Sequence, residues 1–261
     1  MPFLISVRES IRINSSPISE ALFTKYFFEV WDKLSNDALQ NPGTYKPGYN
    51  QVLTLLAFHV FFSEQVDVAI FETNSGGTYD ATNIVKPNVV GITRLGIDHV
   101  STLGSTIESI AWHKSGIFKS QIPAFSSLQV PAATAILQER AAEKFAQLTF
   151  VGVDDRLPAD TVKPMVQREN VSLALALAST FLQEKAPQED CNITQQDITR
   201  GIELFSWPGR FQQIINGNCQ WFLDTAHNQV SIPVVGKWFA EITADMKWYV
   251  NRQYFLHTIQ G

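Results

Sequence analysis

The chain has 261 residues, of which 45% are hydrophobic, and its formal net charge is −5. That length and hydrophobic content suffice for one large domain, or for one domain with part of a second. The acidic balance leaves no basic surface of the kind that nucleic acid binding needs, and the apolar runs are too short to cross a bilayer. We therefore expect neither nucleic acid nor a membrane as a partner.

The two cysteines, Cys191 and Cys219, do not form a C-x-x-C motif. This spacing argues against a structural zinc site or a disulfide framework. We expect two free, buried thiols in a reducing compartment.

The first part of the chain predicts two helices. Residues 19–34 carry apolar side chains at helical spacing, and residues 51–63 form a strongly apolar run typical of a buried helix. The segment between them, residues 41–49, contains two prolines and two glycines, which predicts a loop.

The middle of the chain alternates between strand and helix patterns. Apolar runs predict strands at residues 66–71 and 88–93, and further strands starting at 123 and at 148. Helices are predicted at residues 103–116 and 131–147. For the first of these, Ser105 would be the N-cap, with Glu108 completing a capping box and Gly116 ending the helix. This alternation predicts an α/β fold with a mostly parallel sheet flanked by helices.

The last part of the chain predicts helices at residues 170–183 and 194–205, the second with Thr194 as its N-cap. The dipeptide Asn216-Gly217 then indicates a hairpin over residues 214–221. We place a domain boundary near Gln212, which gives domains of residues 1–211 and 212–261.

Groups that can bind a metal follow two of the predicted strands. The strand at 66–71 runs into Glu72, and the strand at 88–93 leads to Asp98 and His99. Ligands of open parallel sheets bind just beyond the carboxyl ends of the strands, so these side chains predict a site. The alternative is that Glu72 is a solvated carboxylate and His99 a packed core histidine.

Three motifs strengthen this prediction because of their order and spacing. They are ETNSGGTYDATN at residues 72–83, ITRLGIDH at residues 92–99 and KSGIFK at residues 114–119. Together they resemble the central, nucleotide-handling domain of the folylpolyglutamate synthases, ATP-dependent amide ligases related to the Mur ligases. The resemblance implies a Mur-ligase-type central ATP-binding domain over residues 1–211, followed by the start of a smaller α/β glutamate-ligase domain over residues 212–261.

The same resemblance implies a set of metal and catalytic residues. Glu72 and His99 would hold Mg²⁺ against the nucleotide phosphates, and Lys114 would be carbamylated and serve a second metal ion. K⁺ or another monovalent cation is a further candidate. Asp224 and His227, in LDTAHN, would close on the nucleotide and the acyl phosphate. Without the resemblance, Lys114 would only complement a helix dipole.

Three further assignments depend on the resemblance as well. Asn170 matches a position near the adenine, although an asparagine that opens a helix is as often a simple cap. Arg210, in WPGR, matches an arginine that contacts phosphates, and a guanidinium fits phosphate oxygens in a bidentate manner. The N-terminal PFLISVRESIRIN resembles a segment that lines the pteridine side of the folate site, where Arg8 and Arg12 would steer anionic glutamates.

The resemblance implies a function and its partners. The chain would belong to a ligase that adds L-glutamate to tetrahydrofolate or folylpolyglutamate through a γ-amide bond, with ATP and an acyl-phosphate intermediate. A monomer in the cytoplasm, in mitochondria or in both would be expected.

Departures from the family pattern keep two alternatives open. The family's phosphate-binding loop, G-T-N-G-K-G-S, is not found in these 261 residues. Thr73-Asn74 stands in place of the usual Val-Gly, Arg94 in place of a small polar residue, and Thr225 in place of a glycine. One alternative is a catalytically inactive remnant or regulatory paralogue. The other is a ligase similar to dihydrofolate synthase.

Overall fold

The computed structural model describes residues 3–41, 43, 46–158, 162–186, 192–228 and 230–244. Cys191 and residues 246–261 therefore lie outside the described part of the chain. The chain divides into two compact units, Met1–Val85 and Lys86–Gly261. Each unit contains a hydrophobic core of its own.

The first unit is built on two helices, as the sequence predicts. Helix α1 (Glu20–Gln40) begins after Ser19, whose side chain accepts a hydrogen bond from the Leu22 amide, and α2 (Tyr49–Ser63) follows the loop. Tyr26 of α1 and Leu56 of α2 are buried in the same core. A short turn η1 (Val7–Ser10) and a small hairpin, β1 (Arg12–Ile13) with β2 (Ser16–Pro17), precede the helices.

The strand predicted at residues 66–71 is wrong. These residues follow α2 without forming a strand, and Val68 and Ile70 are 50% and 87% exposed. A short apolar run fits a buried strand, but a strand also needs a neighbour that takes its backbone hydrogen bonds. Among the described residues of this unit, the one sheet is β1–β2, whose strands pair with each other.

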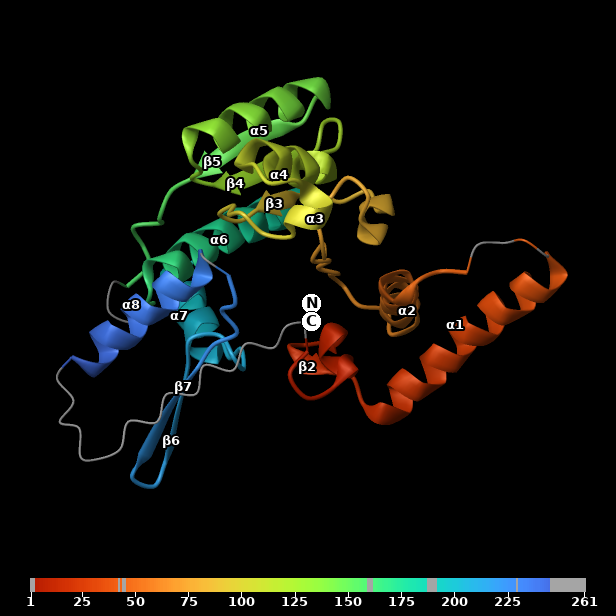
Figure 1. The fold of residues 1–261 in the computed structure, drawn as a ribbon, viewed down its shortest axis with the longest axis horizontal. Helices are drawn as coiled ribbons and strands as arrows, with labels where there is room; N and C mark the ends of the chain where they lie inside the picture. The colour runs from red at the N-terminus through yellow and green to blue at the C-terminus, as the bar shows by residue number, and fades with distance from the viewer. Residues whose placement is uncertain are drawn as a thin grey trace. The chain divides into compact units, whose positions relative to one another are not determined.

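The second unit has a three-stranded parallel sheet at its centre, which confirms the α/β prediction. Its strands are β3 (Val90–Ile92), β4 (Pro123–Ser127) and β5 (Gln147–Val151), in that spatial order. In Figure 1 the sheet lies between α5 (Pro131–Glu143) and α6 (Met165–Lys185).

The two faces of this sheet are covered by different helices. On one face, Val90, Ile92 and Ala124 share a core with Ala111 of α4 (Ile107–Lys114) and with residues of α5. On the other face α6 comes so close to the sheet that β3 carries a glycine, Gly91, beneath Leu177. The remaining elements are η2 (Ala81–Ile84), α3 (Val100–Leu103), η3 (Ser115–Ile117), α7 (Gln195–Leu204), β6 (Gln212–Asn216), β7 (Cys219–Leu223) and α8 (Ser231–Thr243).

Three predicted helix ends are corrected by the structure. The N-cap of α4 is Thr106, which accepts from the Ser109 amide, and Ser105 lies one residue before it. The same helix ends at Lys114, two residues before Gly116. Asn170 does not open its helix, because α6 begins at Met165. Propensity places a helix well but its ends poorly, since the ends depend on which side chain reaches the free amides.

The predicted C-terminal hairpin is present, with its turn shifted by one residue. Asn216 pairs with Cys219, so the turn residues are Gly217 and Asn218. Cys219 is exposed, which contradicts the expected buried thiol. The hairpin begins at Gln212, where the domain boundary is predicted, and the two-domain division at this residue stays a prediction.

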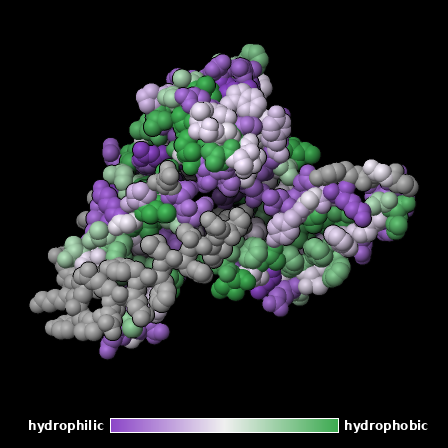
Figure 2. Space-filling view, viewed as in Figure 1, coloured by the Kyte–Doolittle hydropathy of each residue, from purple (hydrophilic) through white to green (hydrophobic). Residues whose placement is uncertain are grey.

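Apolar side chains reach the surface of both units. Figure 2, which has the same view as Figure 1, shows hydrophobic patches on the helices of each. Phe62 of α2 and Ile215 of β6 are 86% and 77% exposed. No helix in the described part of the chain is long and apolar enough to span a membrane.

Candidate functional site

The loops beyond the carboxyl end of the parallel sheet are held together by one glutamine. Gln129, in the loop after β4, accepts a hydrogen bond from the Leu95 amide at 2.9 Å and donates to the Thr93 carbonyl at 2.9 Å. Its amide also donates to Ser126 Oγ at 3.1 Å. The loop after β3 is therefore fixed to the loop after β4, and this ordered edge is where ligands of such sheets bind.

Asp98, in the loop after β3, connects two of the sequence motifs. Its Oδ1 accepts from the His99 amide at 2.7 Å, and its Oδ2 accepts from Asn228 Nδ2 at 2.9 Å. His227 Nε2 lies 3.8 Å from the same Oδ2. The structure thus brings ITRLGIDH and LDTAHN into contact, although about 130 residues separate them.

These contacts change the acidity of Asp98. Partial burial raises the pKa of its carboxyl, but the hydrogen bonds from the His99 and Asn228 amides and the nearby charges of His99 and His227 outweigh it. The net pKa lies below the usual value, so Asp98 is an anion at neutral pH. A fixed negative charge therefore stands directly beside His99 and His227.

His99 itself is exposed and has an unusual backbone. Its φ of 50° lies in the left-handed region, and it forms the N-cap of α3. Arg94, five residues earlier, pairs with Glu169 of α6 at 3.3 Å. The positive charge of Arg94, which departs from the family pattern, is thus partly balanced by the carboxylate of Glu169.

Glu72 lies in the first unit, just before the glycine loop, and is exposed. The loop is closed by Asp80, whose carboxylate accepts from the Asn74 amide and from the Thr82 amide and hydroxyl. This agrees with a structural role for Asp80 and Thr82. Gly76 has a φ of 78°, which a residue with a side chain adopts only with strain.

Lys114 and Asn170 are placed on helices of the second unit. Lys114 is the last residue of α4 and is half-buried, and the adjoining turn η3 is held by Lys144, whose Nζ donates to the Gly116 carbonyl at 2.8 Å. Asn170 lies in the second turn of α6, so the interpretation as a helix-opening cap is wrong.

The remaining predicted residues, Asp224 and Arg210, lie at the two ends of the C-terminal hairpin. The Asp224 carboxylate accepts from the Phe211 and Ala226 amides, each at 2.8 Å. Arg210 Nη1 donates to the Gly209 carbonyl at 3.2 Å. Asp224 therefore has a structural role in the bend before β6, and the role that the resemblance implies for it stays a prediction.

Arg8 and Arg12, by contrast, donate hydrogen bonds to nearby residues of the N-terminal segment. Arg8 donates to the Ile18 carbonyl and Arg12 to the carbonyls of Glu9 and Ser15. Both guanidiniums stabilise the N-terminal turn and hairpin, which the sequence pattern did not reveal.

The two side chains that the resemblance assigns to the metal are both exposed, and they belong to different units. Glu72, in the first unit, offers a carboxylate, and His99, in the second unit, offers an imidazole. Mg²⁺ commonly takes few protein ligands and keeps water and phosphate oxygens. No cluster of three or more His, Cys, Asp or Glu side chains that could hold a metal occurs within the described ranges.

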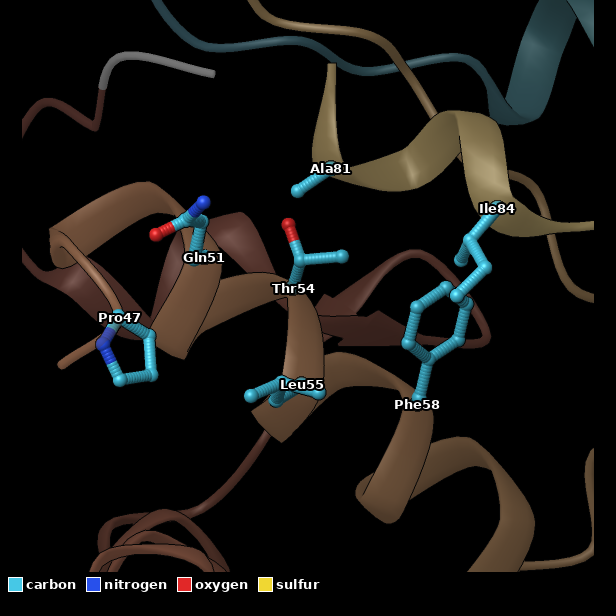
Figure 3. A pocket seen from close by; sticks show the side chains of 7 residues that line it. All are labelled: Pro47, Gln51, Thr54, Leu55, Phe58, Ala81 and Ile84. Carbon is cyan, nitrogen blue, oxygen red and sulfur yellow. The ribbon is translucent and has the colours of Figure 1, made fainter. Parts of the chain in front are cut away.

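An apolar hollow of about 350 Å³ in the first unit is separate from these residues. Figure 3 shows it between α2 and η2, with Phe58 beside Ile84 and Thr54 facing Ala81. The polar groups on its wall are already used locally: Gln51 Oε1 accepts from the Gly48 amide, and Thr54 donates to the Asn50 carbonyl.

Comparison with known proteins assigns the fold to a family. The model of the Mur ligase middle domain matches residues 24–191, and the chain belongs to this family. Among individual proteins, it is 47% identical to the folylpolyglutamate synthase of Neurospora crassa over 248 residues, which are 92% of this chain and 47% of that protein.

Solved structures lead to the same group of proteins. A complex described as FPGS-AMPPCP-folate superimposes with a TM-score of 0.81 at 26% identity, covering 93% of this chain and 63% of that one. The Yersinia pestis bifunctional folylpolyglutamate synthase/dihydrofolate synthase, complexed with AMPPNP and Mn ion, gives a TM-score of 0.74 at 27% identity, covering 94% and 58%. The chain spans about half the length of the curated relatives it matches.

Sequence reasoning missed one residue of this site. Asn228 is the contact between the two motifs, yet only Asp224 and His227 of LDTAHN were predicted to act. The signal that the sequence offered was that Asn228 belongs to the LDTAHN motif. Its partner could not be read from the sequence, because a contact between residues 98 and 228 exists only in the folded chain.

Proposed function

We propose that this chain is the Mur-ligase-type part of an ATP- and Mg²⁺-dependent ligase that adds L-glutamate to tetrahydrofolate or folylpolyglutamate through a γ-amide bond. The observation that carries the proposal is the contact of Asp98 with Asn228 and His227, which joins the two motifs that should face the nucleotide. The relatives named for this activity, and the solved complex with AMPPCP and folate, support the choice of substrates.

The reaction proceeds in two steps. The terminal carboxylate of the folate attacks the γ-phosphorus of ATP, which forms an acyl phosphate and releases ADP. The amine of glutamate then attacks the acyl carbon and loses one proton to the solvent, the amide bond forms, and inorganic phosphate leaves with the electrons of the C–O bond.

The residues of this chain bind and orient the reactants. Glu72 and His99 would hold Mg²⁺, which when bound neutralises phosphate charge, and the carbamate of Lys114 would hold a second ion. Arg210 would bind phosphate oxygens at the bend before the hairpin. His227, beside the fixed charge of Asp98, would close on the nucleotide from the loop after β7.

The test is incorporation of labelled glutamate into tetrahydrofolate by the purified chain, with and without Mg-ATP. Nucleotide-dependent incorporation would support the proposal. The Glu72→Ala variant should lower this incorporation by at least about 10- to 100-fold, which is the loss caused by removing a group that only supports a metal ligand. Glu139→Ala, which removes an exposed carboxylate of α5, is the matched control and should leave the rate unchanged.

Two outcomes would count against the proposal. No incorporation by a folded chain would favour an inactive remnant for these 261 residues. Incorporation with dihydropteroate in place of tetrahydrofolate would move the assignment to a dihydrofolate synthase-like ligase.

A further inference from the structure

The side-chain amide of Asn228 is held at both ends. Its Oδ1 accepts hydrogen bonds from the Ser231 amide at 2.8 Å and from the Val230 amide at 3.1 Å, at the start of α8. Its Nδ2 donates to Asp98 Oδ2 at 2.9 Å. The reversed orientation of the amide would face an oxygen to the carboxylate and N–H groups to N–H groups, so this network fixes it.

Other contacts show that the two loops meet over several residues. A Cβ placed on Gly96 would lie 3.0 Å from Val230 Cγ2, so the backbone of the loop after β3 passes directly against the loop after β7. His227 Nε2 lies 3.8 Å from Asp98 Oδ2. The hydrogen bond from Asn228 to Asp98 is the shortest polar contact between these loops that the structure gives.

We propose that Asn228 is a positioning residue that ties the start of α8 to Asp98 and, through Asp98, fixes the backbone of His99. The Asp98 carboxylate uses one oxygen for Asn228 and the other for the His99 amide. Holding Asp98 therefore holds the left-handed turn that presents the His99 side chain. The functional part of this inference rests on the proposed function, in which His99 faces the metal and His227 the nucleotide.

A purely local role for Asn228 can be separated from this coupling. Asparagine is a common helix cap, and the Oδ1 contacts with Val230 and Ser231 are of that kind. The capping contacts use only the oxygen, and the contact with Asp98 uses only the nitrogen. Aspartate retains the capping oxygen, so substitution by aspartate changes the coupling and preserves the cap.

An exchange of donor and acceptor tests the coupling. N228D places two carboxylate oxygens against each other, and D98N places two NH₂ groups against each other. The double variant D98N/N228D restores one donor and one acceptor in the same place. Position 98 keeps an oxygen for the His99 amide in all three proteins.

The first measurement is hydrogen–deuterium exchange of the His99 amide in the full 261-residue chain without ligand. Each single variant should raise its rate by about 3- to 10-fold, as expected for the loss of one hydrogen bond. The double variant should return it to within about twofold of the original chain. The Leu137 amide, in the core helix α5, is the internal control and should not change.

Two results would overturn the proposal. One is an unchanged His99 rate in both single variants. The other is a His99 exchange rate in the double variant that is no lower than the rate in the faster-exchanging single variant. This outcome includes the case in which the substitutions unfold the unit, so that the Leu137 amide exchanges faster as well.

A second measurement connects the coupling with the proposed function. Titration of Mn²⁺ in the presence of AMPPCP should give about 10-fold weaker binding for each single variant and recovery in the double variant, because groups that orient metal ligands have effects of this size. If the original chain binds no Mn²⁺, the proposed function fails while the exchange experiment still decides the coupling. If the original chain binds Mn²⁺ and the variants bind it equally well, the contact between Asn228 and Asp98 does not affect metal binding by His99.

Discussion

Gly91 of β3 lies directly beneath Leu177 of α6, so that a Cβ on Gly91 would stand 2.7 Å from Leu177 Cδ1. A side-chain heavy atom fits between the strand and the helix at this point only if Leu177 or α6 moves. Glycine is therefore favoured here by the close approach of α6 to the sheet, on the face opposite to Val90 and Ile92.

This contact predicts the effect of adding a methyl group. Gly91→Ala should lower the free energy of unfolding by about 1–3 kcal/mol, because the extra atom forces Leu177 or α6 to move. Adding Leu177→Ala to the Gly91→Ala variant should recover part of that loss. Gly152→Ala is the matched control: a Cβ there meets no atom within 4 Å, so its effect should be small. Urea unfolding followed by circular dichroism measures all four proteins, and an equal loss for Gly91→Ala and Gly152→Ala would refute the explanation.

Gln129 gives a second prediction, for the loops beyond the sheet. Gln129→Glu keeps an oxygen for the Leu95 amide but turns an oxygen toward the Thr93 carbonyl, so it should destabilise the unit by about 1–2 kcal/mol. Gln147→Glu, at an exposed position of β5, adds the same charge and should cost little. The melting temperatures of the two variants would decide, and similar values would mean that Gln129 does not organise this edge.

The ion pair of Asp154 with Arg156 predicts a dependence on pH. The hydrogen bond from the Arg156 side chain, at 2.7 Å, is the main cause that lowers the pKa of Asp154 in the folded chain. Its stabilisation is therefore present above the unfolded pKa, roughly 3.9, and is lost as the pH falls through the lower, folded value.

Asp154→Asn should then be less stable than the original chain at pH 7, by about 0.2–1 kcal/mol for this partly exposed pair. The difference should shrink as the pH is lowered below about 4. Unfolding free energies measured across this range provide the check. Asp155→Asn, at the exposed neighbouring position, should show neither effect, and a difference for Asp154→Asn that grows on acidification would show that the sign is wrong.

Lys114 gives a prediction for the proposed activity. If its carbamate serves a metal ion, Lys114→Ala should lower glutamate addition by about 10- to 100-fold. Assay in buffer freed of carbon dioxide and bicarbonate should lower the rate of the original chain, and added bicarbonate should restore it. Full activity without bicarbonate would leave Lys114 with its ordinary role at the end of α4, where a cation complements the helix dipole.

Much of the fold could be predicted from local pattern. The helices α1, α2 and α7, the strands β3 to β5 and the C-terminal hairpin lie close to where the sequence places them. Thr194, predicted as the cap of α7, accepts from the Asp197 amide as expected. These features depend on periodicity, turn residues and caps, which act over a few residues.

The errors fall where one particular hydrogen-bonding partner decides. Residues 66–71 have the composition of a strand, but no described strand of their unit pairs with them. Ser105 and Thr106 are both suitable caps, and only the geometry of the first turn of α4 selects Thr106. Local propensity cannot settle such cases, because the deciding hydrogen bond is made with a group that the pattern does not specify.

The candidate site divides in the same way. The sequence alone determined that carboxylate, imidazole and amine groups stand in three spaced motifs, and from these it predicted Glu72, His99 and Lys114 as site residues. Only the tertiary structure decided that Asp98 meets Asn228 and His227, and that Arg94 is paired with Glu169. The physical reason is that a hydrogen bond acts over about 3 Å in space whatever the separation along the chain, so partners of this kind are set by how the sheet and helices pack.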